Sequence, residues 1–498
     1  MTEARARRRR RAPRGDTASK RKVNYRHLRN PFPPMTIFSD DEIASMHEAS
    51  LRTLEELGIK VLLSEARRLY RQGGARVEGE MVFIGREIVE AALTSAPRSI
   101  TCRAGARDRD VLLELDLLNF QPGAGAPHAT DLTRGRRPGT VQDYRELVRI
   151  TQHYDVLQMM PALIGPQDVP IHLRHYFTME AQLTLSDKLP FISSRGSPQV
   201  GESFEMLRDC RGLDDAEFRA EPHCYTLINT NSPRVLDVPM ARGLIDFARA
   251  NQVSIVAPFT LMGAMAPITA ASAITLTQLA RKGAPICYGT FTSNVDMKSG
   301  APAFRTPAHF HASLAAGQLA RMIGLPWRSA AGSAANLNDV QAANENQLGL
   351  WCYILAGATL VIHSAGWLEG GLTVSYKKLI CDVEVLNMVA ELCAGAQAGA
   401  SEIGLGALAE VQPSGHFFSA AQTIARYQIE FYEPVVHDYA NFGTWKERGS
   451  QDASPRATKV WQSILAEDTG PAVNPERIDA LKACISRQSA AGGAPSES

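Results

Sequence analysis

The chain has 498 residues, of which 45% are hydrophobic and 21% are charged, and its formal net charge is +1. This length can hold one large barrel with additions at its ends, or two ordinary domains, and either arrangement can bury a sizeable core. No apolar run approaches the roughly 18 residues that a membrane span needs, which excludes a membrane-spanning protein.

The charge is distributed unevenly along the chain. Residues 1–22 contain ten Lys and Arg against Glu3 and Asp16, so this segment carries a charge of +8 and the remainder is mildly acidic. We predict that residues 1–35 form a basic, disordered tail. Such a tail could contact nucleic acid or an acidic partner, or it could simply be a solvated segment before the folded domain. The tail alone does not lead us to predict a nucleic-acid-binding protein.

The eight cysteines are scattered and contain no Cys-x-x-Cys pair. Because the basic segment has no apolar signal-peptide core, we expect reduced thiols in a cytoplasmic protein. His309 and His311 come nearest to a metal-ligand pair, but residues two apart on a helix face different directions. We therefore predict no metal site.

Residues 36–116 are expected to form an N-terminal cap. Ser39 and Glu42 have the spacing of a capping box, and the helix that they open is expected to end near Gly58. Strand-like pieces follow at residues 81–84 and 100–103. These short helices and strands are expected to pack against the main domain.

From residue 117 to residue 364 the chain repeats one pattern eight times: a short apolar run, a polar or small-residue loop, and an amphipathic stretch of one helix length. Such apolar runs are typical of buried parallel strands. They lie at residues 117–121, 156–164, 190–193, 223–229, 253–259, 284–290, 326–330 and 359–364. The alternation predicts an α/β fold, a TIM (β/α)8 barrel over residues 117–400. A C-terminal helical extension is expected over residues 401–487 and a loose end over residues 488–498.

In such a barrel the functional groups lie on the loops that follow the C-terminal ends of the strands. Here those loops are rich in glycine and nearly free of lysine, and their spacing matches neither the Walker nor the Rossmann fingerprint. Glycine lets another group approach the backbone closely. We interpret these loops as the walls of a roomy mouth.

Aromatic residues gather at the same ends of the strands. Their rings could enclose a quaternary ammonium or sulfonium, with each cation-π contact contributing about 0.5 to 2 kcal/mol, or they could be ordinary barrel packing. The candidates are Phe259, Tyr288, Phe291, Trp327, Trp351 and Trp367.

Five polar residues are further candidates for substrate binding. Gln341 and Glu345 are four apart at the start of a predicted helix and so share one face. Glu345 could balance a cationic substrate or be a surface carboxylate. His363 ends the eighth strand and could contact substrate or be a core histidine. Asn229 and Asn231 could hold a polar or anionic end of the substrate, and no catalytic acid or base is assigned.

Several of these segments together resemble the trimethylamine methyltransferase family. The resemblance spans residues 36–465 and rests on the order and spacing of its motifs. The matching segments are residues 39–58, 231–233, 283–290, 296–300, 339–345, 356–366, 378–384, 415–417 and 445–457.

The resemblance implies a TIM-barrel enzyme that moves a methyl group from a methylated amine to the cobalt of a corrinoid. The chain has no pyrrolysine, so it is similar to the branch that includes glycine betaine methyltransferase. A quaternary ammonium already has a neutral amine as leaving group, so the protein mainly has to position the reactants. The corrinoid is expected on a separate small protein, because no Asp-x-His-x-x-Gly cobalamin signature occurs here. We also expect a homo-oligomer.

Two departures from the family pattern keep alternatives open. The stretch between Thr269 and Gly283 is shorter than in relatives by about three helical turns, and Ala308 stands where relatives often have Glu. The leading hypothesis is methyl transfer from glycine betaine or a similar quaternary ammonium compound. The alternatives are a sulfonium or methylthio donor, and a catalytically silent homologue that binds a methylated solute or the corrinoid partner.

Overall fold

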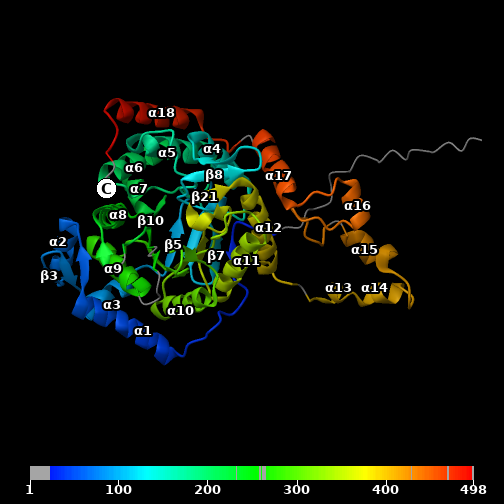
Figure 1. Cartoon of the computed structure of the whole chain (residues 1–498), viewed down its shortest axis with the longest axis horizontal. Coiled ribbons are helices and arrows are strands. Elements are labelled where there is room, and N and C mark those ends of the chain that lie inside the picture. The colour runs from blue at the N-terminus through cyan, green and yellow to red at the C-terminus, as the bar shows by residue number, and fades with distance from the viewer. Residues whose placement is uncertain are drawn as a thin grey trace, which may run out of the picture.

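The computed structural model describes residues 23–495 apart from residues 232, 257–258, 261–264, 397, 428 and 468–469. The basic segment 1–22 lies outside the described residues. The architecture is mixed α/β, with helices arranged around the central strands (Figure 1).

Six parallel strands form the centre of the molecule, in the order β7-β19-β18-β14-β12-β10, and β1 pairs antiparallel with β7. All six coincide with predicted strands, because their apolar residues are buried on both faces, as a parallel sheet requires. The seven strands are β1 (Leu28–Arg29), β7 (Leu117–Phe120), β10 (Tyr225–Ile228), β12 (Val253–Val256), β14 (Ile286–Gly289), β18 (Trp327–Ala330) and β19 (Leu360–Ile362).

The two remaining predicted strands, at residues 156–164 and 190–193, are present only as single β-bridges. Pro161 and Pro190 interrupt regular pairing there, since proline has no N–H to donate. The bridges, all parallel, join Met159 to Leu189, Phe191 to Tyr225, and Ala126 to Ile164.

The helices between these strands pack on the outside (Figure 1). Side-chain caps fix several helix starts: Thr140 accepts a hydrogen bond from the Asp143 N–H, and Asp237 and Asp339 cap α8 and α11. The helices are α4 (Val141–His153), α5 (Arg174–Leu185), α6 (Ser197–Arg211), α7 (Asp215–Ala220), α8 (Val238–Arg249), α9 (Met265–Ala280), α10 (Pro307–Ile323), α11 (Val340–Leu355) and α12 (Tyr376–Cys393), with 3-10 turns at Ile171–Leu173 and Glu369–Gly371.

The N-terminal cap begins with the predicted capping box. Glu42 N donates to Ser39 Oγ, and Ser39 N donates to a carboxylate oxygen of Glu42. A four-stranded sheet, β11-β2-β4-β3, joins the cap to the loop after β10. The cap elements are α1 (Asp40–Arg52), a π turn (Thr53–Leu57), β2 (Ile59–Val61), α2 (Ser64–Gln72), β3 (Arg76–Glu78), β4 (Met81–Phe83) and α3 (Arg86–Ser95), and the loop strand is β11 (Val235–Leu236).

Residues 23–35, which the composition assigns to the tail, are folded. Leu28 is buried and pairs with Leu118 of β7. The Tyr25 hydroxyl donates to Glu391 at 2.5 Å. The apolar side chains that follow the basic stretch anchor this segment to the body, so residues 23–35 are not part of a disordered tail.

A hairpin of β5 (Ser99–Cys102) and β6 (Val111–Glu114) covers the N-terminal ends of the central strands. Arg103 N donates to the carbonyl of Pro222, just before β10, and Thr359 Oγ1 donates to the carbonyl of Glu114, just before β19. A 3-10 turn (Arg107–Arg109) connects its strands. Because this end is covered, access to the interior comes from the carboxyl ends of the strands.

Short sheets project from the loops at those carboxyl ends. One has four strands in the order β20-β21-β8-β9, and two have only two strands. The strands are β8 (His128–Asp131), β9 (Gly135–Pro138), β20 (Trp367–Leu368), β21 (Thr373–Ser375), β13 (Phe259–Thr260) with β15 (Phe291–Thr292), and β16 (Asn294–Val295) with β17 (Pro302–Ala303).

The C-terminal region first extends away from the body and then packs against it again. Helices α13 to α16 extend beyond the body, whereas α17 packs on α12 and α18 on α6 (Figure 1). Helix α18 continues past residue 488, where the sequence predicts a loose end, and Gln199 donates to the Ala494 carbonyl. No helix in the described part of the chain is long and apolar enough to cross a membrane. The elements are α13 (Ala400–Ile403), α14 (Leu405–Glu410), a 3-10 turn (Phe417–Ser419), α15 (Ala421–Arg426), α16 (Phe442–Glu447), α17 (Ala453–Glu467) and α18 (Pro475–Ala490).

Candidate functional site

A cavity of about 1050 Å³ lies at the carboxyl ends of the central strands. Its volume reaches the upper end of the usual range for small-molecule sites, roughly 300 to 1000 Å³. Five predicted site residues line it, together with residues that the sequence did not single out. The predicted ones are Asn229, Asn231, Phe291, His363 and Trp367, and the additional ones include Phe191, Arg195, Asp237, Phe304 and Arg328.

Strand alternation decides which side chains enter the cavity. Successive residues of a strand point to opposite faces, so Trp327 and Arg328 of β18 cannot both face inward. Arg328 lines the cavity, whereas Trp327 packs against the outer helices and donates its Nε1–H to Thr290. Tyr288 of β14 likewise belongs to the outer core. Both predicted aromatic residues therefore lie behind the cavity wall.

The aromatic side chains that do line the cavity form one cluster. Phe291 and Phe304 stack with ring centroids 5.2 Å apart, and Phe304 lies 5.8 Å from Trp367. The indole of Trp367 stacks on the His363 ring. The loops after β14 and β19 supply all four of these rings, so aromatic faces concentrate in one part of the cavity lining.

Glycines make room for Trp367. A Cβ atom at Gly332 would lie 2.0 Å from the indole, and one at Gly371 would lie 2.3 Å from it. Behind the same loop, Asp382 accepts a hydrogen bond from Gly366 N at 2.8 Å and pairs with Lys378 in the buried interior. Gly332, which belongs to a loop predicted to shape the mouth, and Gly371 thus accommodate an indole of the chain itself.

His363 is held in a neutral form. Its backbone has a φ of 55°, a left-handed conformation uncommon for a non-glycine residue. Ala124 N donates to His363 Nδ1 at 3.1 Å, so the neutral ring carries its proton on Nε2. Burial and the nearby Arg328 and Arg305 guanidinium groups hold the pKa of His363 well below its ordinary value. The neutral ring can therefore donate a hydrogen bond, but it is not a protonated group that could act as a general acid.

Arg305 ties together the wall behind the cavity. Its guanidinium donates to the Glu345 carbonyl at 2.9 Å, to the Ala330 carbonyl at 3.1 Å and to the Tyr353 hydroxyl. It also contacts His309, whose pKa is lowered by burial and by this guanidinium. These neutral partners hold the loop after β18 against α10 and α11.

The asparagines line the cavity from the loop after β10, which is separated from β18 by β14 and β12. Asn231 donates to a carboxylate oxygen of Asp237 at 2.7 Å, and the other oxygen of Asp237 accepts from Met240 N at the start of α8. Asp237 is thus a fixed negative charge on the cavity wall. Among the described lining residues Asp237 is the carboxylate, and it has the role that the sequence suggested for Glu345.

Glu345 and Gln341 contact each other but do not line the cavity. Gln341 Nε2 donates to Glu345 at 2.9 Å, as expected of two residues on one helix face. The other Glu345 oxygen accepts from Ser333 and from Ala334 N, so the carboxylate supports the loop after β18. Trp351 packs on Phe32 away from the cavity, and the side chain of Phe259 lies outside the described residues.

Of the cavity residues that the sequence analysis missed, Arg328 carried a signal in the sequence. Arg328 is the charged residue of a predicted buried strand, and a charge there is costly to bury without a partner. Asp237 stands where a helix N-cap is expected, before α8, and this structural role gave no reason to predict that it also lines the cavity. Phe304 lies between the short strand β17 and helix α10 and had no sequence pattern of its own.

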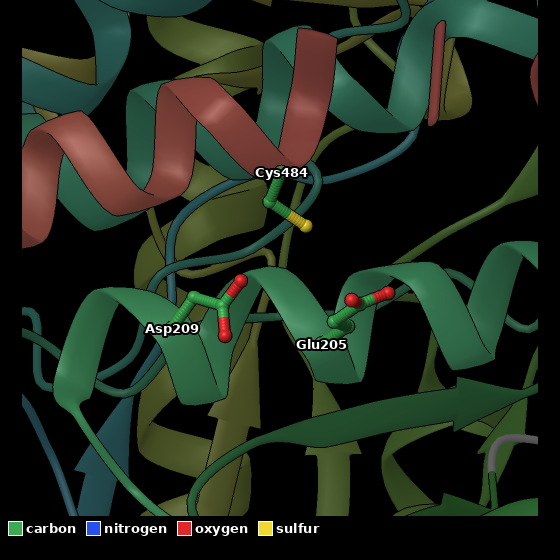
Figure 2. Close-up of side chains that lie close together, drawn as sticks. All are labelled: Glu205, Asp209 and Cys484. Carbon is green, nitrogen blue, oxygen red and sulfur yellow. The ribbon is translucent and has the colours of Figure 1, made fainter. Parts of the chain in front are cut away.

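Outside the cavity, Glu205, Asp209 and Cys484 lie close together where α18 crosses α6 (Figure 2). The Glu205 oxygens already accept hydrogen bonds from Arg487 and Gln488, both at 2.6 Å. Burial, and then the two carboxylates, raise the pKa of Cys484 to about 12, so its thiol stays protonated at neutral pH. Because metals bind the thiolate, this set is better suited to joining two helices than to holding an ion.

Comparison with known proteins places the chain in a family. The family described as trimethylamine methyltransferase (MTTB) matches residues 3–493. Glycine betaine methyltransferase of Desulfitobacterium hafniense strain Y51 is 30% identical over 469 residues, covering 92% of this chain and 98% of that protein. Trimethylamine methyltransferase MttB of Desulfitobacterium hafniense strain DSM 10664 / DCB-2 is 28% identical over 460 residues, covering 89% and 92%.

Among solved structures, the monomethylamine methyltransferase MtmB of Methanosarcina barkeri gives a TM-score of 0.45 at 9% identity, covering 93% of this chain and 90% of that one. The family and the named relatives are methyltransferases. On the match across nearly its whole length, this chain belongs to the trimethylamine methyltransferase family.

Proposed function

We propose that this protein transfers a methyl group from a small quaternary ammonium compound, glycine betaine or a relative, to the cobalt of a corrinoid held by a separate small protein. The observation that carries the proposal is the aromatic cavity at the strand ends of a chain in this family. Relatives named for glycine betaine and for trimethylamine support the class of donor.

The reaction needs position more than acid-base chemistry. The methyl carbon passes to cobalt(I), the C–N bond breaks with its electron pair on nitrogen, and a neutral tertiary amine leaves. No proton has to be supplied, which agrees with a neutral His363 and with cysteines that burial keeps protonated. Holding the carbon in line with the cobalt is the main contribution of the protein.

The cavity supplies the groups for this task. Phe291, Phe304 and Trp367 present aromatic faces to the ammonium, each worth about 0.5 to 2 kcal/mol. Asp237 adds a negative charge to the lining of the same cavity. The open mouth lets the corrinoid partner approach from the side away from the β5–β6 hairpin.

We also infer that the central strands close into a TIM (β/α)8 barrel. Backbone hydrogen bonds support closure: Gln158 N donates to the Phe120 carbonyl at 3.0 Å, and Ile192 N to the Tyr225 carbonyl at 2.9 Å. The bridged segments thus lie between β7 and β10. Hydrogen exchange tests this inference, since slow exchange of the Gln158 and Ile192 amides is expected and fast exchange would contradict closure.

The protruding C-terminal arm, residues 400–447, supports the proposal of a homo-oligomer. Its large apolar side chains are strongly exposed: Phe418 by 83%, Phe431 by 77% and Phe442 by 73%. Contiguous exposed apolar groups mark interaction surfaces. We propose that the arm packs against a second copy of this chain.

The methyltransferase proposal is tested with the full-length protein, cobalt(I) cobalamin and a panel of donors. The panel contains glycine betaine, choline, trimethylamine, a dimethylsulfonio carboxylate and a methylthio carboxylate. The spectral change to methylcobalamin is expected with a quaternary ammonium donor. Methylcobalamin formation only with a sulfur-containing donor would show that the donor is a sulfonium or methylthio compound. No methylcobalamin formation by folded protein would favour a catalytically silent homologue.

A further inference from the structure

Arg328 carries a buried positive charge that the described protein does not neutralise. The residue is only 2% exposed, and no carboxylate among the described residues lies within ion-pair distance of it. One guanidinium nitrogen makes a long hydrogen bond, 3.5 Å, to the Thr290 carbonyl. The buried Nε atom has no hydrogen-bond partner among the described residues.

Such a group is costly and therefore calls for an explanation. Burying a cation without a partner is strongly unfavourable, and native proteins rarely leave such donors unsatisfied. Desolvation lowers the pKa of Arg328 to about 10, which still leaves the guanidinium charged at neutral pH. Arg305 shows the contrast, because it is also buried but has carbonyl and hydroxyl acceptors.

Arg328 also lines the cavity beside the second available donor. The neutral His363 ring carries a proton on Nε2 and lines the same cavity. The Arg328 guanidinium lies 5.8 Å from the centroid of the Phe291 ring, so the positive group adjoins the aromatic cluster. The cavity's own carboxylate, Asp237, is engaged by Asn231 and by the start of α8.

We propose that Arg328 binds the carboxylate of the methyl donor, with His363 Nε2 donating a second hydrogen bond. This inference rests on the proposed function and specifies its substrate class: a quaternary ammonium carboxylate, not a simple amine or an amino alcohol. A planar guanidinium matches a carboxylate and forms strong charge-assisted hydrogen bonds with it. The rings then receive the ammonium, so the two ends of a zwitterion meet complementary walls.

Calorimetry with the full-length protein tests the assignment without requiring turnover. Glycine betaine and choline share the trimethylammonium group and differ in the carboxylate. We expect glycine betaine to bind at least tenfold more tightly than choline. In Arg328→Met this preference is expected to disappear, and in Arg328→Lys part of it is expected to remain. Equal binding of the two ligands by the unmodified protein, or an unchanged preference in Arg328→Met, would overturn the proposal.

A matched variant and a stability measurement separate binding from folding. Arg321→Met removes a partly buried guanidinium that does not line the cavity, so it is expected to keep the betaine preference. Without ligand, Arg328→Met is expected to melt no lower than the unmodified protein, since it removes an uncompensated charge. A clearly lower melting temperature would assign Arg328 a structural role and overturn the proposal.

The two proposals fail in different ways. Betaine preference without methylcobalamin formation from any donor would overturn the proposed function and leave the carboxylate site standing. Methyl transfer with equal binding of glycine betaine and choline would overturn the carboxylate site and leave the proposed function standing.

Discussion

His363 and Trp367 stack face to face, with ring centroids 4.2 Å apart and planes inclined by only 5°. The contact joins the residue directly after β19 to an indole four residues further along the same loop. It fixes the imidazole where Ala124 N can donate to Nδ1, leaving the Nε2 proton for the cavity. A histidine chosen for its place in the sequence thus becomes an oriented hydrogen-bond donor.

Replacing His363 tests this orientation. His363→Ala is expected to abolish donor-dependent methylation while the fold remains, because it removes the donor and the stacking face together. The methylcobalamin assay and circular dichroism measure the two effects. His416→Ala, in the exposed C-terminal arm, is the matched control and should retain full activity. Unchanged turnover in His363→Ala would remove this residue from the site.

Gly332→Ala is expected to displace Trp367, because the added Cβ would lie 2.0 Å from the indole. The backbone at Gly332 also has a φ of 104°. We expect altered tryptophan fluorescence and weaker betaine binding. Gly300→Ala is the matched control, since Gly300 has a φ of 74° but an added Cβ there meets nothing within 4 Å. Equal behaviour of the two variants would contradict a role for the indole contact.

The two buried arginines of the site should respond oppositely to substitution. Arg305→Met leaves the Tyr353 hydroxyl and several carbonyls without their donor and is expected to cost about 3 kcal/mol of unfolding free energy or more. Arg328→Met should be close to neutral. Urea denaturation of both variants measures the difference. Similar losses in both would show that Arg328 is satisfied within the protein.

Stability is expected to fall as the pH is lowered from 6.5 to 4. Burial and the Arg211 charge lower the pKa of His223 to about 4, whereas histidine in an unfolded chain titrates near 6.5. Between these values the unfolded state binds a proton that the folded state does not, so acid favours unfolding. His223 alone would contribute a loss of about 2 kcal/mol between pH 7 and pH 5.

Urea midpoints at pH 7 and pH 5 check this expectation. The lowered pKa values of His309 and His363 act in the same direction. His223→Phe should reduce the pH dependence, because it removes one of the titrating groups and retains a ring beside Phe218. A midpoint that is independent of pH over this range would contradict the buried, neutral state of these histidines.

The C-terminal arm should control self-association. Phe418→Asp combined with Phe431→Asp places charges on two strongly exposed rings and is expected to convert the oligomer into monomers. Light scattering coupled to size-exclusion chromatography measures the mass. Ser401→Asp, on the same arm but at a polar position, is the control. A monomeric unmodified protein would contradict the proposed contact between copies.

The sequence by itself determined most of the central strands and several helix starts of this protein. Six of the eight apolar runs became parallel strands, because side chains buried on both faces impose a nearly continuous apolar pattern. The helix starts at Ser39 and Thr140 follow from local capping hydrogen bonds. The position of His363, Asn229 and Asn231 at strand ends was likewise enough to bring them to one cavity.

Only the tertiary structure decided which neighbouring side chain faces inward. Trp327 and Arg328 differ by one position, and the orientation of β18 sends the indole to the outer helices and the guanidinium into the cavity. Asp237 took the place suggested for Glu345 because contacts between distant loops, not sequence spacing, set the cavity wall. The local sequence pattern determines whether a segment forms a strand or a helix. Which of its faces points inward depends on the elements that pack against it.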